Sequence, residues 1–262
     1  MKFLVIADLH LDLWKKSGRD PFSEVEPHIS ELDMLVLAGD LTNKPKIRWY
    51  PAFQKLSKLL APEKIHVFPG NHDFYYFRID QEEQLDNLAT SSGVRYVNCK
   101  EIRTDGLRIL CATLWTDFEL CGDRIWNESF IPTVMNDYRY IRVAQDGFRA
   151  LTPRDLIELH QQQLQWLDKK LRENFDGKTL VATHHAPHPA VLRSHSAGVE
   201  AAYASDLEAF IAEHQPDAWL FGHCHDAVDI SIGSTRIENV SLGYPHEVAN
   251  PGQRIMSLIR SI

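Results

Sequence analysis

Residues 2–10, KFLVIADLH, join a continuous apolar run to the triplet Asp8-Leu9-His10 that follows it directly. A short apolar run of this kind, stopped by polar residues, predicts a strand that is buried on both faces. Similar runs occur at residues 33–38, 65–68, 107–112, 179–183 and 218–221. We therefore predict a sheet of short, buried and mainly parallel strands.

Amphipathic stretches between these runs predict helices at residues 53–60, 81–89 and 153–174. The longest has Thr152 as a candidate N-cap, Pro153 at its first position and Asp155 in its first turn. Strands that alternate with helices indicate βαβ units, in which functional groups collect beyond the carboxyl ends of the strands. Residues 226–232, 235–240 and 254–259 alternate more strongly, which predicts antiparallel strands on a second sheet.

All 262 residues are predicted to form a single α/β domain, because 44% of them are hydrophobic and 24% are charged, as in average globular proteins. Residues 115–151 differ from the rest, since they combine weak periodicity with many charges and several aromatic side chains. We interpret this segment as an inserted cap or a long loop region, and an irregular pair of helices fits the pattern equally well.

The net charge of −8 at pH 7 disfavours nucleic acid as a partner, because the field of the protein repels a polyanion. The four cysteines include no Cys-x-x-Cys pair and are too few for a disulfide scaffold, which favours a cytoplasmic location. No stretch approaches the roughly 18 consecutive apolar residues of a membrane span, so we expect no membrane partner. No pattern indicates the oligomeric state.

Polar motifs follow the apolar runs in order along the chain. They are Asp8-Leu9-His10, Gly39-Asp40, Gly70-Asn71-His72-Asp73, Thr183-His184-His185-Ala186-Pro187 and Gly222-His223-Cys224-His225. In a chain of this composition Asp-x-His occurs by accident about once, Gly-His-x-His about 0.03 times, and Gly-Asn-His followed by an acid about 0.003 times. The order of the motifs and their positions after strands therefore indicate one shared site.

The donor types in these motifs are those of a transition-metal site. Alternate side chains of a strand point to the same side, so Asp8 and His10 are predicted to reach one ion, and His223 and His225 share that geometry. The same alternation directs Cys224 away, as a buried thiol. Two carboxylates, one amide oxygen and four imidazoles suit two divalent or mixed-valence ions of Mn, Fe, Zn or Co better than Mg or Ca, which prefer oxygen ligands.

These motifs resemble those of the calcineurin-like metallophosphoesterase superfamily and span the chain from Asp8 to His225. The resemblance implies a four-layer α/β/β/α sandwich with two mixed sheets and a binuclear metal site at the strand ends. It also implies the ligands, which are Asp8, His10, Asp40 and His225 for one ion and Asp40, Asn71, His184 and His223 for the other, with Asp40 bridging. The segments 135–139, 233–236 and 243–244 resemble those of a bacterial subgroup of this superfamily whose substrate is unassigned.

Such a pair of ions is expected to hydrolyse a small-molecule phosphomonoester or phosphodiester through attack of a metal-bridging hydroxide on phosphorus. His72, beside Asn71, is predicted to stabilise the transition state or protonate the leaving oxygen, with Asp73 orienting its ring. Arg139 and His185 are candidate substrate contacts, Arg139 because a guanidinium binds phosphate in a bidentate manner.

Other functions are compatible with parts of this pattern. A protein phosphatase of the serine/threonine type would place an arginine shortly after Gly-Asp, whereas residues 41–45 read Leu-Thr-Asn-Lys-Pro. A nuclease would be expected to show a basic surface. A catalytically silent scaffold that binds a partner protein would have lost one or more of Asp8, Asn71, His72 and His223, all of which are present.

Two further groups of residues carry weaker signals. Residues 74–77, Phe-Tyr-Tyr-Phe, are either an aromatic wall of the substrate site or core packing of the loop after His72, and core packing is favoured. His188, His195 and His246 are predicted to lie in loops or on the surface.

Overall fold

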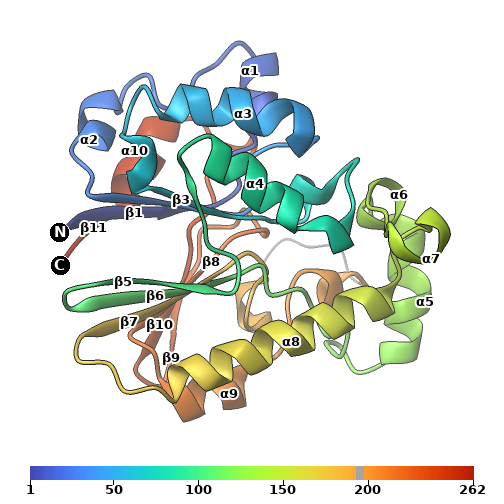
Figure 1. Cartoon of the computed structure of the whole chain (residues 1–262). Coiled ribbons are helices and arrows are strands. Elements are labelled where there is room, and N and C mark those ends of the chain that lie inside the picture. Colours follow the sequence, from blue (N-terminus) through green and yellow to red (C-terminus); the bar gives the residue numbers. More distant parts are fainter. Residues whose placement is uncertain (193–197) are drawn as a thin grey trace.

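The computed structural model describes residues 1–192 and 198–262, so His195 lies outside the described residues. Its strands form two sheets (Figure 1). In the first sheet the strands run in the order β11 (Ile259–Ser261), β1 (Lys2–Ile6), β2 (Met34–Ala38), β3 (Ile65–Phe68) and β4 (Arg95–Tyr96). The pairs from β1 to β4 are parallel and β11 is antiparallel to β1, so the sheet is mixed.

The second sheet is also mixed. Its order is β5 (Lys100–Thr104), β6 (Leu107–Ala112), β7 (Lys178–Thr183), β8 (Ala218–Phe221), β10 (Thr235–Asn239) and β9 (Asp229–Ile232). The four central strands are parallel, whereas β5 and β9 are antiparallel edges. Residues 7 and 241 form an isolated parallel bridge between the two sheets. The parallel strands of both sheets therefore end on the same side of the molecule.

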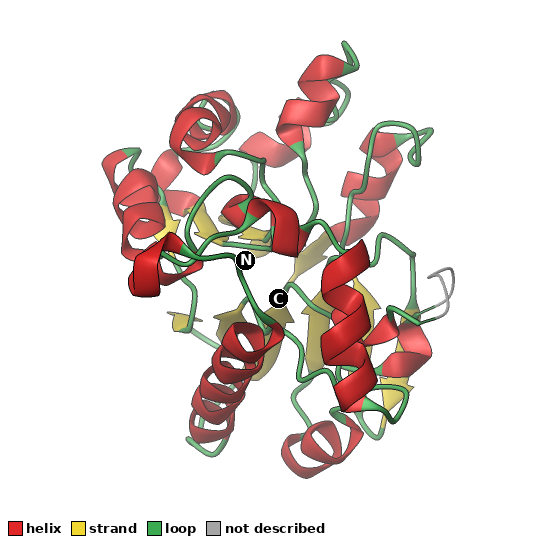
Figure 2. Ribbon diagram, turned by 90° about the vertical axis from the view of Figure 1, so that its right-hand side faces the viewer, coloured by secondary structure: helices red, strands yellow, loops and turns green. Residues whose placement is uncertain are grey.

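Helices cover the outer faces of the two sheets (Figures 1 and 2). On the first sheet lie α1 (Leu11–Lys16), α2 (Glu26–Ser30), α3 (Pro45–Leu56), α4 (Glu83–Ser91) and α10 (Pro251–Leu258). On the second lie α8 (Pro153–Leu171) and α9 (Glu208–His214). The predicted four-layer arrangement of two mixed sheets flanked by helices is therefore confirmed. In the described part of the chain, no helix has both the length and the apolar composition of a membrane-crossing segment.

The central strands form because their side chains are apolar on both faces. All residues of β2, β3 and β6 are buried, and Leu4, Val5 and Ile6 of β1 are 0% exposed. The predicted start of α8 is confirmed, since Thr152 and Asp155 form a reciprocal capping box in front of Pro153.

Two element predictions are wrong. The helix expected at residues 53–60 begins earlier, because Pro45 occupies its first turn after Lys44 turns the backbone with φ +55°. The strand expected at residues 254–259 is mostly the helix α10, which begins after the N-cap Asn250 and is followed by the short strand β11. Ile255 and Leu258 are both buried and are spaced as on one face of a helix. In so short a segment, the pattern of apolar residues does not distinguish this helical spacing from the alternation of a strand.

Residues 115–151 fold into short helices, α5 (Arg124–Val134), α6 (Asp137–Tyr140) and α7 (Gln145–Phe148), joined by loops. They lie on the side of the molecule opposite the two termini (Figure 1). The termini themselves are adjacent, since the amino group of Met1 donates a hydrogen bond of 2.6 Å to the carbonyl of Ile262. Short one-turn helices occur at Pro62–Lys64, His72–Phe74, Ile79–Gln81, Pro189–Val191 and Glu200–Ala202.

Candidate metal centre

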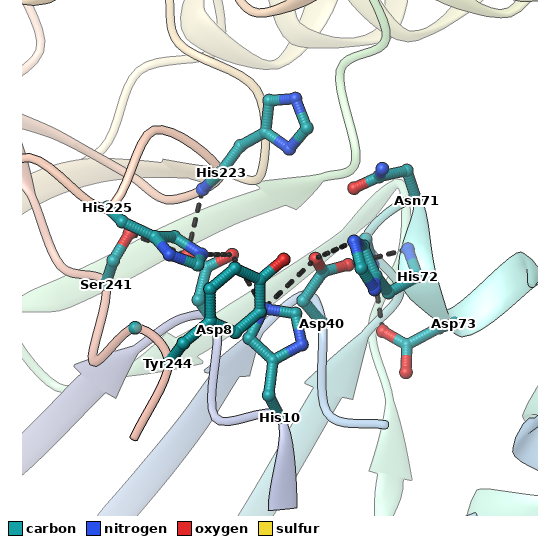
Figure 3. A network of polar contacts seen from close by, with 12 residues as sticks. Asp8, His10, Asp40, Asn71, His72, Asp73, His223, His225, Ser241 and Tyr244 are labelled. Carbon is teal, nitrogen blue, oxygen red and sulfur yellow. Dashed lines mark hydrogen bonds and ion pairs between the residues drawn. The ribbon is translucent and has the colours of Figure 1, made fainter. Parts of the chain in front are cut away.

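The seven predicted metal ligands meet at the carboxyl ends of the parallel strands. Figure 3 labels all of them except His184. Each ligand lies in the short segment that follows the end of a strand, and in chain order these strands are β1, β2, β3, β7 and β8. Because β1, β2 and β3 are parallel neighbours in the first sheet, β7 and β8 are parallel neighbours in the second, and residues 7 and 241 join the two sheets, motifs far apart in sequence become neighbours. The structure therefore brings together all the residues to which the sequence assigned metal binding.

One cluster contains Asp8, His10 and His225. The distance from Asp8 Oδ1 to His225 Nε2 is 3.2 Å, and that from Asp8 Oδ1 to His10 Nε2 is 3.9 Å. The other oxygen of Asp8 accepts hydrogen bonds from Ser241 Oγ at 2.6 Å and from the backbone N–H of His223 at 2.8 Å. Oδ1 is thereby left to face the cluster.

A second cluster contains Asp40, His184 and His223, with Asn71 beside it. His184 Nε2 lies 3.4 Å from Asp40 Oδ1 and 3.1 Å from Asn71 Oδ1. The other oxygen of Asp40 lies 3.7 Å from His10 Nε2 in the first cluster. Asp40 therefore stands between the two clusters, as a bridging ligand would.

The donor atoms are set up for a cation. In the described part of the chain Asp8 Oδ1, both ring nitrogens of His10 and His223 Nε2 are buried without a hydrogen-bond partner. Buried polar atoms without partners are costly, and a bound cation would satisfy these. The Nδ1–H groups of His184 and His225 donate to the Ala38 carbonyl at 3.1 Å and to Glu247 at 2.8 Å, which turns each Nε2 toward the centre.

The protonation of the histidines agrees with this reading. Burial lowers the pKa of His10, His184 and His223 below the usual value, so their rings are neutral at pH 7 and keep a lone pair for coordination. Burial also acts to lower the pKa of His225, but the charges of Asp8 and Glu247 and the hydrogen bond to Glu247 raise it to about 10. A cation bound here would have to displace that proton.

The direction of the ligands has a different cause from the one expected. Strand alternation was the predicted reason that Asp8 and His10 point together, but β1 ends at Ile6 and β8 ends at Phe221, before the ligands. The backbone is instead left-handed at five of the ligands, with φ +55° at Asp8, +39° at His10, +58° at Asp40, +66° at His223 and +56° at His225. Such conformations are strained for residues other than glycine and concentrate at functional sites.

Two glycines leave room for this arrangement. A Cβ atom on Gly39 would lie 2.2 Å from His184 Nδ1, and one on Gly70 would lie 2.3 Å from Asp40 Oδ1. Both distances are far below van der Waals contact, and both neighbours are buried side chains of the centre. Glycine is therefore required at these positions by the close approach of the ligands.

His72 is held by Asn43. Asn43 Nδ2 donates to Asp12 at 3.2 Å, so Asn43 Oδ1 is left to accept from His72 Nδ1–H at 3.0 Å. Nε2 of His72 then faces the centre, 3.9 Å from Asp40 Oδ2, and the ring stacks on Tyr75 with centroids 4.2 Å apart.

Asp73 has a different role from the one predicted. Its carboxylate accepts hydrogen bonds from the backbone N–H groups of Leu41, Thr42 and Gly70 and from Trp49 Nε1, at 2.8 to 3.2 Å. It is 0% exposed and joins the loop after β2 to the loop after β3. The prediction that Asp73 orients the His72 ring is wrong, because these donors occupy its oxygens and Asn43 holds the ring.

Asp137 supports the ligand Asn71. Its Oδ1 accepts hydrogen bonds from Asn71 Nδ2 at 2.8 Å and from the Tyr75 hydroxyl at 2.7 Å. This directs the Asn71 oxygen toward His184 and the centre. The sequence had singled out residues 135–139 only as a subgroup resemblance, and nothing local to Asp137 indicated a partner 66 residues away.

The candidate substrate contacts lie in two different places. His185 is 2% exposed, its Nδ1 lies 3.3 Å from the Thr113 carbonyl, and its ring packs between Trp115 and His223. This position supports His223 and leaves no surface for substrate, so the substrate-contact prediction for His185 is wrong. Arg139 is exposed on α6 and lines a cavity beside the centre.

The aromatic residues after His72 divide between core and site. Phe74 and Phe77 are buried in the core, as favoured, whereas Tyr75 stacks on His72 and Tyr76 is 57% exposed.

Cys224 is a buried free thiol, as predicted.

Tyr244 was not predicted as a site residue. It packs against the first cluster, its ring centroid 4.6 Å from those of both His10 and His225 (Figure 3). Burial, followed by the charges of Asp40 and Asp8, raises the pKa of its hydroxyl, which therefore remains a hydrogen-bond donor at neutral pH.

We expect Asp137→Ala to weaken manganese binding at the second cluster, and with it hydrolysis, by about tenfold, because Asn71 loses the acceptor that orients it. Asp137→Asn keeps an oxygen for Asn71 and Tyr75 and should remain within about threefold of the wild type. Activity measured as a function of manganese concentration checks this. Equal manganese dependence in the alanine variant and the wild type would show that Asn71 is oriented without Asp137.

Comparisons with known proteins agree with this geometry. A family model described as calcineurin-like phosphoesterase matches residues 1–227. The 3',5'-cyclic adenosine monophosphate phosphodiesterase CpdA of Escherichia coli (strain K12) is 23% identical over 252 residues, which cover 90% of this chain and 74% of that protein. The phosphopantetheinyl hydrolase PptH of Mycobacterium tuberculosis has a similar structure, with a TM-score of 0.71 and 17% identity over 100% of this chain and 95% of that one.

Proposed function

We propose a metal-dependent phosphodiesterase for small molecules, and the premise is that this chain belongs to the calcineurin-like phosphoesterase family. Phosphoester hydrolysis is the general activity of that family. The observation that carries the proposal is the pair of donor clusters with Asp40 between them and His72 beside them, since Asp40 belongs to the second cluster and lies 3.7 Å from His10 Nε2 of the first. The name of CpdA, a cyclic adenosine monophosphate phosphodiesterase, supports a phosphodiester rather than a phosphomonoester as substrate.

In this proposal Asp8, His10, Asp40 and His225 hold one transition-metal ion, and Asp40, Asn71, His184 and His223 hold the other. The mixed carboxylate, amide and imidazole donors suit manganese, iron or zinc. When bound, two such ions supply Lewis-acid activation of the phosphoryl group and of the attacking water.

His72 exchanges a proton with the reacting groups through Nε2. Burial lowers the pKa of His72 to about 3, so the ring is neutral at pH 7, and the hydrogen bond to Asn43 keeps the proton on Nδ1. Nε2 therefore presents a lone pair toward the centre, where it can take a proton and return it to the leaving oxygen. The stacked ring of Tyr75 limits rotation of the imidazole.

Residues 115–151 act in this proposal as the cap that shapes the substrate site. Asp137 binds the ligand Asn71, and Tyr140 packs on Tyr75 with centroids 5.4 Å apart. The segment is thus in direct contact with the supports of the metal centre, so its side chains are placed to contact the group esterified to phosphorus.

The test is metal content together with hydrolysis of bis(4-nitrophenyl) phosphate and 4-nitrophenyl phosphate, with and without manganese. We expect about two metal ions per chain, turnover that is lost on chelation and restored by manganese, and a higher kcat/KM for the diester. A higher kcat/KM for the monoester would make the chain a phosphomonoesterase. A folded chain that neither binds metal nor turns over either ester after reconstitution would support the silent scaffold instead.

A further inference from the structure

Beside the metal centre, the structure contains a cavity lined by cations and aromatic rings. We propose that this cavity binds a second anionic group of the substrate, of the nucleotide type, with a phosphate and a planar base. The inference rests on the proposed function, because it assigns the part of the substrate remote from the scissile bond. We call the cavity the cationic pocket; its defining residues are Lys46, Arg78, Arg139, Arg142, Tyr76 and Phe148.

The cationic pocket has a volume of ≈ 540 Å³, within the usual range for small-molecule sites. It adjoins the centre through aromatic contacts. Tyr140 lines the pocket and packs on Tyr75, which in turn stacks on His72. The rings of Tyr75 and Tyr140 therefore lie between the pocket and His72, and in our proposal one substrate extends past them from the metal centre to the pocket.

The wall of the pocket is built from the loop that follows His72 and from the 115–151 segment. The backbone N–H of Tyr76 donates to the Tyr140 carbonyl at 2.9 Å, that of Arg142 donates to the Phe77 carbonyl at 3.1 Å, and that of Ile79 donates to the Arg142 carbonyl at 2.9 Å. These bonds hold the two segments together, so the pocket keeps a defined position relative to the metal centre.

The charge of the pocket is unusual for this chain, whose net charge is −8. Among the described side chains, Lys46, Arg78, Arg139 and Arg142 have no carboxylate partner in an ion pair. Many other surface cations of the chain do have one, as Lys100 has in Asp86 and Arg154 in Glu158. An anion that enters the pocket therefore meets four cations that form no ion pair with any described carboxylate.

Asp80, two residues after Arg78, forms hydrogen bonds to the backbone instead of an ion pair with a pocket cation. Both oxygens of Asp80 accept hydrogen bonds at 2.8 Å, from the backbone N–H groups of Ala144 and Gln145. Three of the four cations are arginines, whose planar guanidinium groups bind phosphate oxygens in pairs.

The aromatic residues supply a surface for a planar group. Tyr76 and Phe148 are each 57% exposed, which is high for large aromatic side chains. The Arg78 guanidinium lies 5.8 Å from the Phe148 ring and 6.0 Å from the Phe77 ring. Exposed rings beside arginine are the combination that stacks a nucleobase while the cations bind its phosphate.

The experiment measures binding of ADP by calorimetry to metal-free protein, in which the metal centre cannot contribute through its ions. We expect saturable binding that is at least tenfold weaker for adenosine and for pyrophosphate, because each lacks one of the two recognised parts. R78Q and R139Q should each weaken ADP binding at least threefold, and the double variant at least tenfold. F148A should weaken binding of ADP but not of pyrophosphate.

The matched control is K169Q, which removes an exposed cation on α8 away from the pocket. It should bind ADP within twofold of the wild type. Wild-type affinity in the R78Q/R139Q variant, or equal weakening in K169Q, would overturn the inference, and so would tighter binding of a ten-residue single-stranded oligonucleotide than of ADP. Hydrolysis of bis(4-nitrophenyl) phosphate is measured separately, so failure to bind ADP in an active enzyme contradicts only this inference.

Discussion

Asp40→Ala should reduce hydrolysis by about three orders of magnitude or more and leave both metal sites weakly occupied. Asp40 is the carboxylate that lies between the two clusters, since its oxygens lie 3.7 Å from His10 Nε2 and 3.4 Å from His184 Nε2. Elemental analysis after gel filtration measures the loss of metal, and kcat/KM on bis(4-nitrophenyl) phosphate measures the loss of activity.

Thermal unfolding separates a metal-binding role of Asp40 from a structural one. Burial, followed by the charges of Asp8 and Asp73, raises the pKa of Asp40 well above the usual value, so its ionised form is unfavourable in the metal-free chain. Manganese should therefore raise the Tm of the wild type and leave that of Asp40→Ala unchanged.

The matched control for this substitution is Asp105→Ala, which removes an exposed carboxylate in the turn between β5 and β6. It should keep both metal ions and full activity. Two tightly held metal ions in Asp40→Ala would contradict the bridging role.

His72→Ala should lower kcat by about two orders of magnitude or more while both metal ions remain bound. Nε2 of the ring faces the centre and forms a further group of donors with His10 and Asp40, but Nδ1 is bound to Asn43 and the ligands proposed for the two ions do not include His72. Metal content should therefore equal that of the wild type.

The leaving group identifies the step in which His72 acts. If the ring returns a proton to the leaving oxygen, the loss in His72→Ala must be larger for a diester with an alkyl leaving group than for bis(4-nitrophenyl) phosphate, whose leaving group needs little protonation. Asn43→Ala, which frees the ring without removing it, should give a smaller loss with the same dependence. Wild-type kcat in His72→Ala would remove this residue from the mechanism.

Short-range patterns in the sequence predicted the strands well, and the residues that they proposed as metal ligands lie together in the structure. Each buried strand is a short apolar run, and each ligand follows such a run, so local sequence contains both the element and the motif. At residues 254–259 the apolar pattern fits both the alternation of a strand and the spacing of a helix, and the predicted strand was wrong. Burial of Ile255 and Leu258 in the core favours the helix.

The sequence by itself determined which residues meet in the candidate metal centre, since the motifs are rare and lie at the ends of parallel strands. Only the tertiary structure decided how those residues are aimed and held: left-handed backbone at Asp8 and His10, Asn43 rather than Asp73 on His72, and Asp137 on Asn71. The physical reason is that a ligand type is a property of one residue, whereas its orientation depends on hydrogen bonds to partners that only folding brings into contact.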